Sequence, residues 1–528
     1  MTAAAARVLV KEEIAQAGVD LLRTRFQVDV APDMQPAELA ERISGYDALI
    51  VRSATRVTAE LIDRADRLRV IGRAGAGVDN VDVAAATRRG IVVANAPGSN
   101  MVAAAEHAVG LLLALARNIP QADAALHAGR WERQRFGGVE LCDKTLGIVG
   151  FGRIGQLVAA RARALEMRVL VHDPFVSDER CRELQVTPVA LERLWEQAEF
   201  ITLHAPLTED TRHLVDAAAI ERMRPGVRIV NAARGGLIDL DALVAGLRSG
   251  RVGGAGLDVF PQEPYTEGEI LDCENVVVTP HLGASTAEAQ VRAGVIVAEQ
   301  VAAALSGELV SNAVNIPQVG AEELGAVRPF LALATRLGRL ALGLGEASGS
   351  LEVVYSGGLA EHDTRLVTAA VLVGAFAGRT DDHVNLVNAH SVAEAHGVTV
   401  VERHSRTAGD FTNLIAVSSG REVSVSGTTI GRDNRPWLIS VHGQQVEIEL
   451  APTMLVMFND DRPGIIGRVG TLLGEERVNI ANMNVSRHEQ GHRAAMVLSL
   501  DAPPAPAALA RLRALEGIHN VRLVDLGD

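Results

Sequence analysis

Cysteine and excess positive charge are both scarce in this chain. Its three cysteines, Cys142, Cys181 and Cys273, have no metal-type spacing and no even framework, so they predict buried or incidental thiols in a reducing compartment. The formal net charge of −14 argues against nucleic acid as a partner, because phosphate backbones are bound by clustered Lys and Arg. We therefore expect neither a metal site nor a nucleic-acid partner.

Long apolar runs are absent as well. No stretch approaches the length of a membrane span, and Arg7 and Lys11 lie too close together to leave an uninterrupted signal core. We expect a cytoplasmic protein with no membrane partner. What the chain does have is 48% hydrophobic residues with only 3% aromatic, a balance rich in small aliphatic residues that is typical of α/β folds. Its 528 residues predict about three or four domains.

The order of apolar segments predicts several domains. Short strands alternate with helical stretches up to about residue 98, which indicates a parallel sheet with helices on both faces. Ser99 is expected to cap a long apolar helix that runs to about Arg117. A second α/β unit begins near residue 145, and the short strands between about 318 and 452 predict a separate α+β domain. From Thr453 the order strand, helix, strand, strand, helix, strand predicts a ferredoxin-like domain.

A glycine motif in the second unit predicts a dinucleotide site. Gly150, Gly152 and Gly155 follow a strand and open a helix. The first glycine would permit a tight turn, the second would let a pyrophosphate approach the backbone, and the third would let helix and strand pack closely. Asp173, at the end of the next strand, would accept hydrogen bonds from ribose hydroxyls and repel a 2′-phosphate, which favours NAD over NADP.

Three further residues predict redox chemistry on a hydroxyacid. Arg234 in NAARGG would bind a carboxylate and polarise the adjacent carbonyl, and His281 in TPHLGAST would transfer the hydroxyl proton. Glu263 in PQEP would orient His281 and raise its proton affinity. Without this arrangement, Arg234 and Glu263 would be predicted to be exposed charged side chains with no role in catalysis. The other histidines, His107 among them, lack such a setting and are expected to be structural.

These motifs, with VRSAT at 51–55 and RAGAGVDN at 73–80, resemble the D-2-hydroxyacid dehydrogenase family, and within it the long-form branch that acts on D-3-phosphoglycerate. The resemblance implies an α/β fold in which a Rossmann-type nucleotide-binding domain is inserted in a flavodoxin-like substrate domain. An intervening α+β domain and a ferredoxin-like ACT domain would follow. The implied limits are 1–98 and 286–317 for the substrate domain, 99–285 for the NAD-binding domain, 318–452 for the intervening domain and 453–528 for the ACT-like domain.

The resemblance also implies an activity and further contacts. The activity is NAD-dependent oxidation of D-3-phosphoglycerate to 3-phosphohydroxypyruvate, the first step of L-serine biosynthesis, by a homo-oligomer that is expected to be a tetramer and that is also expected to reduce 2-oxoglutarate. The added cofactor contacts are Arg153, Ile154, Ala232 and Asp258, the last through the nicotinamide carboxamide. The implied substrate pocket contains Arg52, Ser53, Arg73, Ala74, Gly75, Asn100 and Arg133, together with Arg234 and His281. In relatives the loop arginine that matches Arg133 comes from the adjoining subunit.

The tail carries an implied effector site. Relatives bind serine at positions that match Asn459, Asp461 and Asn479, so L-serine is expected to bind between the ACT-like domains of two subunits and to inhibit. The DRPG turn at 461–464 is expected to face Asn479, with the helix N-terminus stabilising the effector carboxylate.

Other functions remain open at this stage. One is a D-2-hydroxyacid dehydrogenase for glyoxylate or hydroxypyruvate; Arg52, Arg73 and Arg133 argue against it, because guanidinium groups suit phosphate. A second is an NAD-sensing corepressor-type scaffold, for which no peptide groove or partner-binding tail is visible in the sequence. A third, a stand-alone amino-acid sensor, is disfavoured by the intact set of Arg, Glu and His.

Overall fold

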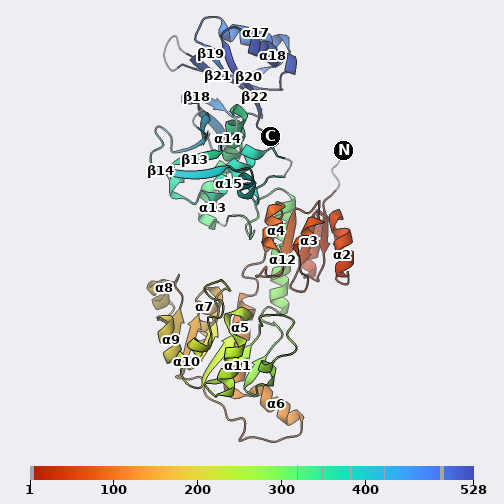
Figure 1. The fold of residues 1–528 in the computed structure, drawn as a ribbon, viewed down its shortest axis with the longest axis vertical. Coiled ribbons are helices and arrows are strands. Elements are labelled where there is room, and N and C mark those ends of the chain that lie inside the picture. The colour runs from red at the N-terminus through yellow and green to blue at the C-terminus, as the bar shows by residue number, and fades with distance from the viewer. Residues whose placement is uncertain are drawn as a thin grey trace.

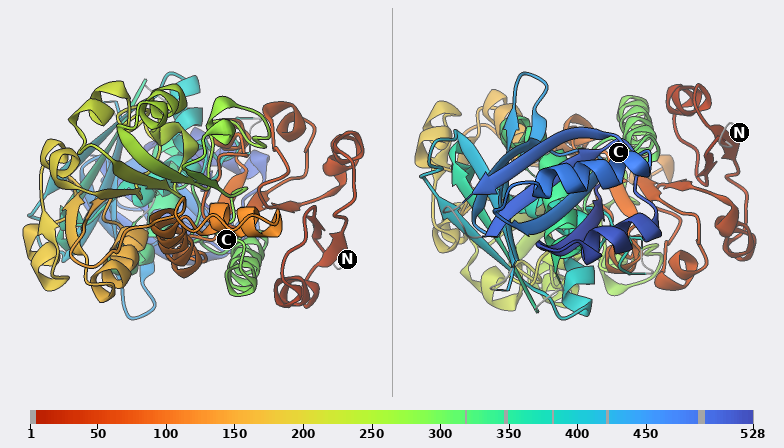
Figure 2. Two further views of the ribbon diagram at one scale, coloured as in Figure 1. Left: turned by 90° about the horizontal axis from the view of Figure 1, so that it is seen from below. Right: turned by 90° about the horizontal axis from the view of Figure 1, so that it is seen from above.

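The computed structural model describes residues 5–317, 319–345, 349–380, 383–420, 423–487 and 493–527. Four sheets follow one another along an elongated molecule, and the N-terminal sheet lies between the second and the third (Figure 1). In both end-on views the N-terminal part stands to one side of the others (Figure 2). The predicted limits at residues 1, 318 and 528 lie outside the described residues.

The first domain is a parallel five-stranded sheet in the order β2-β1-β3-β4-β5. Its strands are β1 (Arg7–Val10), β2 (Gln27–Val30), β3 (Ala48–Val51), β4 (Val70–Arg73) and β5 (Val92–Asn95), and its helices are α1 (Gln16–Arg23), α2 (Pro36–Arg42), α3 (Ala59–Asp63), α4 (Val83–Arg88) and the later α12 (Ala287–Leu305). Apolar clusters cover both faces of the sheet. Helix α12 returns to this domain against α1, where a Cβ on Gly18 would lie 2.5 Å from the carbonyl oxygen of Gly294.

The second domain is a seven-stranded parallel sheet in the order β12-β11-β10-β9-β6-β7-β8. The strands are β6 (Thr145–Val149), β7 (Arg168–His172), β8 (Thr187–Pro188), β9 (Phe200–Leu203), β10 (Val227–Asn231), β11 (Val252–Leu257) and β12 (Val276–Val278). The helices are α5 (Met101–Arg117), α6 (Ile119–His127), α7 (Arg153–Ala164), α8 (Asp178–Glu183), α9 (Leu191–Gln197), α10 (Ala217–Arg222) and α11 (Leu240–Arg248). The order in which the strands are added to the sheet reverses between β6 and β9. Parallel sheets of this kind bind ligands at such a point.

The start of α5 differs from the prediction. Asn100, not Ser99, occupies the N-cap position, and its side chain makes no capping hydrogen bond. The Ser99 hydroxyl is buried and instead donates to the carbonyl oxygen of Ala96 at 2.9 Å. The preceding turn therefore uses the hydroxyl that the sequence pattern assigned to the helix.

The third domain is a six-stranded sheet in the order β14-β13-β15-β16-β17-β18, antiparallel except for the pair β13 and β14. Its strands are β13 (Ser350–Gly357), β14 (Thr399–Ser405), β15 (Asn413–Ser419), β16 (Val423–Ile430), β17 (Arg435–Val441) and β18 (Gln444–Glu449), and its helices are α13 (Ala321–Val327), α14 (Leu331–Leu344), α15 (Arg365–Phe376) and α16 (Ala389–Ala395). Helices α14 and α15 cross so closely that a Cβ on Gly338 would overlap the carbonyl oxygen of Val371.

The fourth domain has the predicted βαββαβ order. It contains β19 (Thr453–Asp460), α17 (Ile465–Glu475), β20 (Ile480–Arg487), β21 (Arg493–Leu500), α18 (Pro506–Ala514) and β22 (Ile518–Asp525), in the antiparallel sheet order β20-β21-β19-β22. One face of this sheet joins the apolar core of the third domain through Met454, Val456 and Val497. The other face packs against α17 and α18.

Polar contacts hold the third domain, and the segment that leads into it, against the edge of the first. The Asn315 side chain accepts from the backbone N–H of Val93 at 2.8 Å and donates to the carbonyl oxygen of Ile91 at 2.9 Å. Asn385 donates to the carbonyl oxygen of Gly90 at 2.7 Å. The apolar core of the third domain continues across this junction to Ala94 of β5.

Within the described residues no single helix is both long and apolar enough to cross a membrane. The bent pair α5 and α6, taken together, has the length and the apolar composition of a membrane span. The buried residues of α5 lie in the core of the second domain.

Candidate active site

The carboxyl ends of the two parallel sheets meet at the junction of the first two domains, and this junction is called the cleft. Arg234 follows β10 of the second domain, and its Nε lies 3.3 Å from Oδ2 of Asp79 in the loop after β4 of the first domain. Glycine at 77 leaves room for this approach, since a Cβ there would meet the ends of the Arg234 and Asp79 side chains, which would have to move. Arg234 thus lies where the two domains meet.

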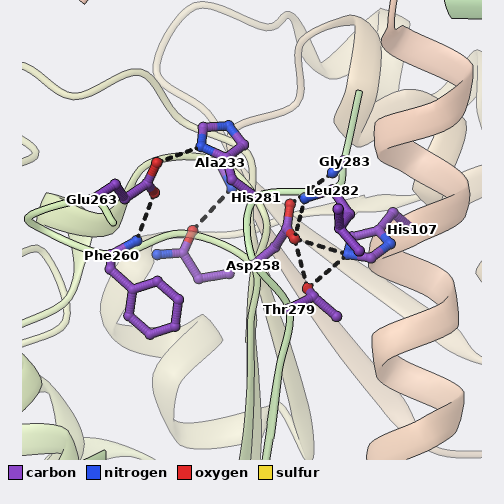
Figure 3. A network of polar contacts seen from close by, with 10 residues as sticks. His107, Ala233, Asp258, Phe260, Glu263, Thr279, His281, Leu282 and Gly283 are labelled. Atoms are coloured by element: carbon purple, nitrogen blue, oxygen red, sulfur yellow. Dashed lines mark hydrogen bonds and ion pairs between the residues drawn. The ribbon is translucent and has the colours of Figure 1, made fainter. Parts of the chain in front are cut away.

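The predicted hydrogen bond between His281 and Glu263 is present. His281 Nδ1 lies 2.7 Å from Oε2 of Glu263, and the other carboxylate oxygen accepts from the backbone N–H of Phe260 at 3.0 Å (Figure 3). The hydrogen bond to Glu263 raises the pKa of His281, against the effect of partial burial. Burial alone would raise the pKa of Glu263, but the hydrogen bonds from His281 and Phe260 lower it. The pair therefore favours a protonated imidazole next to a carboxylate.

His107 is a residue of this site that the sequence pattern did not reveal. It lies on α5 with Nε2 3.1 Å from Oδ1 of Asp258 and 3.0 Å from Oγ1 of Thr279 (Figure 3). The Asp258 side chain is 1% exposed and also accepts from the Thr279 hydroxyl and from the backbone N–H groups of Leu282 and Gly283. The donors around it lower the pKa of Asp258 in spite of burial. Its contact with the nicotinamide carboxamide stays a prediction.

The three glycines of the motif each meet a distinct steric requirement. Gly150 has φ +89°, and a Cβ there would lie 2.6 Å from the backbone of His204. A Cβ on Gly155 would overlap the carbonyl oxygen of Gly150. Gly152 stands at the N-cap of α7 with open space around it, so a negatively charged group can approach the first turn.

Asp173 lies at the predicted end of β7, next to the glycine turn. Its two carboxylate oxygens accept from the backbone N–H groups of Phe151 at 2.7 Å and Phe175 at 2.9 Å. A cavity of about 320 Å³ opens beside it, lined by Val171, His172, Asp173, Val176, Asp178, Cys181, Pro188, Val189 and Ala190. Apolar walls with two acidic residues, Asp173 and Asp178, fit the adenosine half of a dinucleotide. Arg153 and Ile154 begin α7, and Ala232 directly follows β10, so both segments lie at the same sheet edge.

Two of the predicted substrate arginines lie on the first-domain side of the cleft. Arg73 ends β4, and its buried Nε has no hydrogen-bond partner among the described residues. Burial lowers the pKa of Arg73, and Arg234 lowers it further, whereas Asp79 and Glu12 act in the opposite direction. Arg52 directly follows β3, and its backbone N–H donates to Glu12 at 3.0 Å. A desolvated guanidinium with a free donor is suited to bind an anion.

The smaller predicted pocket residues flank these arginines. Ala74 and Gly75 directly follow β4, and Gly75 lies so close to the Arg73 guanidinium that a Cβ would overlap it. Ser53 is exposed in the loop after β3, and Asn100 stands at the start of α5 between the two domains.

Arg133 lies outside the cleft of its own chain. It is exposed in the loop that follows α6, at the end of the second domain farthest from the first domain (Figure 1). Arg135 of the same loop is anchored to Glu274 at 2.9 Å. Exposed apolar side chains surround this loop: Ile119 at 54%, Leu126 at 57% and Trp131 at 83%.

The predicted effector residues are not brought together within one chain, so the turn at 461–464 can face Asn479 only across two subunits, and the expected site between two ACT-like domains stays a prediction. Strand pairing places Thr453 opposite Leu500, and Leu500 opposite Ile480, so Asn479 lies at the Thr453 end of β19. Asn459 is at the other end, about 20 Å away at roughly 3.3 Å per residue. The pairing register of the strands, which the sequence does not display, causes this separation of Asn459 from Asn479.

The fold and these sites agree with comparisons to known proteins. Residues 109–283 match the family model for the NAD-binding domain of D-isomer specific 2-hydroxyacid dehydrogenases. Residues 326–442 match the intervening domain of D-3-phosphoglycerate dehydrogenase, and residues 453–517 match the ACT domain. A structure from Thermus thermophilus, 38% identical with a TM-score of 0.54, covers 58% of this chain and 99% of its own. A glyoxylate reductase from Paecilomyes thermophila, 30% identical with a TM-score of 0.54, covers 60% and 99%.

The dinucleotide fold and the cleft therefore define an NAD-dependent D-2-hydroxyacid dehydrogenase. D-3-phosphoglycerate dehydrogenases from Archaeoglobus fulgidus and Methanocaldococcus jannaschii are 42% and 41% identical, each over 98% of this chain and 100% of their own. The enzyme of that name from Mycobacterium tuberculosis is 41% identical over 98% and 99%. The chain belongs to this D-3-phosphoglycerate dehydrogenase family, which confirms the resemblance, the fold class and NAD as the cofactor.

The position of Asp173 predicts cofactor choice. Asp173→Ala should weaken NAD binding and raise the use of NADP relative to NAD, because the ribose acceptor and its repulsion of a 2′-phosphate are both removed. The measurement is kcat/KM with each cofactor. Asp173→Asn, which keeps the shape and loses the charge, separates repulsion from hydrogen bonding. An unchanged cofactor ratio in both variants would contradict the assignment.

Proposed function

We propose that this enzyme oxidises D-3-phosphoglycerate to 3-phosphohydroxypyruvate and so begins L-serine biosynthesis. The observation that carries the proposal is the buried, unpaired Nε of Arg73 across the cleft from Arg234. A substrate with an anion at each end satisfies two guanidinium groups, whereas a monoanion such as glyoxylate leaves one without a counter-charge. The names of the full-length relatives support the same substrate.

In the proposed oxidation His281 removes the proton from the substrate hydroxyl. Glu263 holds Nδ1 of His281, which leaves Nε2 free to face the substrate. Arg234 binds the carboxylate and stabilises the developing carbonyl oxygen. NAD, when bound, supplies the hydride acceptor. Gly152 and the first turn of α7 bind its pyrophosphate.

A second substrate follows from the same charges. 2-Oxoglutarate is a diacid, so its distal carboxylate can take the place of the phosphate, and we propose that the enzyme also reduces it. Glyoxylate and hydroxypyruvate lack a second anion. The positions of Arg52 and Arg73 disfavour them as the main substrates.

The proposed phosphate site also needs a second subunit. Arg133 is exposed far from its own cleft, in a segment that presents Ile119, Leu126 and Trp131 to solvent. Burying these side chains against another copy would remove apolar area from water and could carry Arg133 to the partner's cleft. We propose a homo-oligomer built on this contact, with a tetramer as the expected assembly.

Replacing the carboxylate next to His281 should change the pH dependence of oxidation. The neutral form of His281 accepts the proton, so activity rises as pH rises through its pKa. Glu263 raises that pKa, and Glu263→Gln should therefore shift the acid limb of kcat/KM for D-3-phosphoglycerate to lower pH while lowering kcat. The measurement is the pH profile of both proteins. A limb that stays in place or moves to higher pH would show that another group titrates.

Arg133→Ala tests both the phosphate and the partner subunit. Wild-type enzyme should prefer D-3-phosphoglycerate over unphosphorylated D-glycerate, and the variant should lose about 10- to 150-fold in kcat/KM on the phosphorylated substrate alone, since a charged hydrogen bond is worth about 1.5–3 kcal/mol. Arg130→Ala, in the same loop, is the matched control. Equal losses on both substrates would show that Arg133 does not bind phosphate, and a wild type without preference would refute the substrate.

Regulation by L-serine is the last part of the proposal. Asn459 is buried, and its Oδ1 has no hydrogen-bond partner among the described residues, so it can accept from an ammonium group. Asn479 lies at the opposite end of the sheet. A site that uses Asn459, Asp461 and Asn479 together therefore requires the ACT domains of two chains.

L-Serine should inhibit the full-length oligomer without competing with D-3-phosphoglycerate. Asn479→Ala should weaken serine about 2- to 13-fold, the cost of one neutral hydrogen bond. Asn482→Ala, in β20, which begins directly after Asn479, should leave inhibition unchanged. Calorimetry and inhibition kinetics provide the measurement. If millimolar serine gives neither heat nor inhibition in an active enzyme, the domain does not bind serine.

A further inference from the structure

We propose that His107 is a positioning residue for the acid/base pair, which it holds in place through Asp258 and Thr279. The inference rests on the proposed role of His281. His107 lies on α5, whereas its partners lie on the strand ends that lead into the His281 turn. In the part of the chain that the structure describes, its side chain forms no hydrogen bond with His281 or Glu263, so any effect must pass through Asp258 and Thr279.

The turn that carries His281 requires support. His281 has φ +55°, a region that side chains with a Cβ seldom adopt. Its backbone N–H donates to the carbonyl oxygen of Asp258 at 2.9 Å. The Asp258 carboxylate then accepts from the N–H groups of Leu282 at 2.7 Å and Gly283 at 2.8 Å. Both sides of the strained residue are thus fixed to Asp258.

The hydrogen-bond pattern assigns the proton on His107. The Thr279 hydroxyl lies 2.6 Å from Oδ1 of Asp258 and donates to it, since a carboxylate can only accept. The lone pairs of Thr279 and Asp258 therefore both face Nε2 of His107. Nε2 must carry the hydrogen, and His107 donates to both oxygens.

The position of His107 explains why its loss should affect catalysis. The Asp258 side chain is 1% exposed, so water cannot readily replace a missing donor. Without His107 the carboxylate would draw closer to solvent or to other donors, and the turn at 279–283 would shift with it. Because a small misplacement of a reacting group lowers turnover strongly, the effect should fall on kcat rather than on binding.

The test compares His107→Leu, which removes the donor, with His107→Gln, whose amide can still donate to Asp258. His107→Leu should lower kcat roughly 10- to 100-fold, with KM for the hydroxyacid and the dissociation constant of NAD within about twofold of wild type. His107→Gln should recover most of the loss. Glu106→Gln, on the same helix but paired with Arg161, is the control. Retained NAD binding and an unchanged melting temperature show that each variant is folded.

A double-mutant cycle with Thr279→Val tests the path. If His107 acts through this network, the double variant should be about as slow as the slower single variant, whereas independent effects would multiply. Multiplying effects, equal damage by His107→Leu and His107→Gln, or an unchanged kcat in His107→Leu would each overturn the inference. His281→Ala is measured beside them: if it stays active, the proposed role of His281 fails, and if it is inactive while His107→Leu is normal, only this inference fails.

Discussion

Repulsion between Arg73 and Arg234 is the constraint around which the cleft is organised. The two guanidinium groups come from different domains, and burial together with the nearby charge of Arg234 lowers the pKa of Arg73. Asp79 and Glu12 offset this repulsion within the chain, and Asp79 does so by pairing directly with Arg234. In the proposed function an anionic substrate would complete this balance of charge between the two domains.

Much of this site could be predicted because short motifs encode it locally. A glycine that needs positive φ, a second that must leave space and an acidic residue after the next strand appear in order along the chain, as Gly150, Gly152 and Asp173 do. Arg234 and His281 were predictable for the same reason, since each follows a buried strand at the carboxyl edge of the sheet. The hydrogen bond between Glu263 and His281 followed from their chemistry once both were placed.

The features that escaped prediction depend on packing over long distances. His107 reaches Asp258 only because α5 lies against β11 and β12, more than a hundred residues later in the chain. Its sequence surroundings are those of any apolar helix. Ser99 was misassigned because its hydroxyl donates to the Ala96 carbonyl oxygen of the preceding turn instead of accepting from a helix N–H, and the separation of Asn459 from Asn479 depends on a strand register that periodicity does not reveal. The domain limits and the roles of the site residues stay predictions.

The attachment of the third domain to β5 has a thermodynamic consequence. The contact of Asn385 joins it, and the contacts of Asn315 join the segment that leads into it, to the sheet that carries Arg73, not to the sheet that carries the glycine turn. In the proposed function, a displacement at the far end of the molecule that follows these contacts would reach Arg73 before it reaches the dinucleotide fold. By linkage, the proposed effector and the hydroxyacid should then alter each other's affinity more than either alters the affinity for NAD.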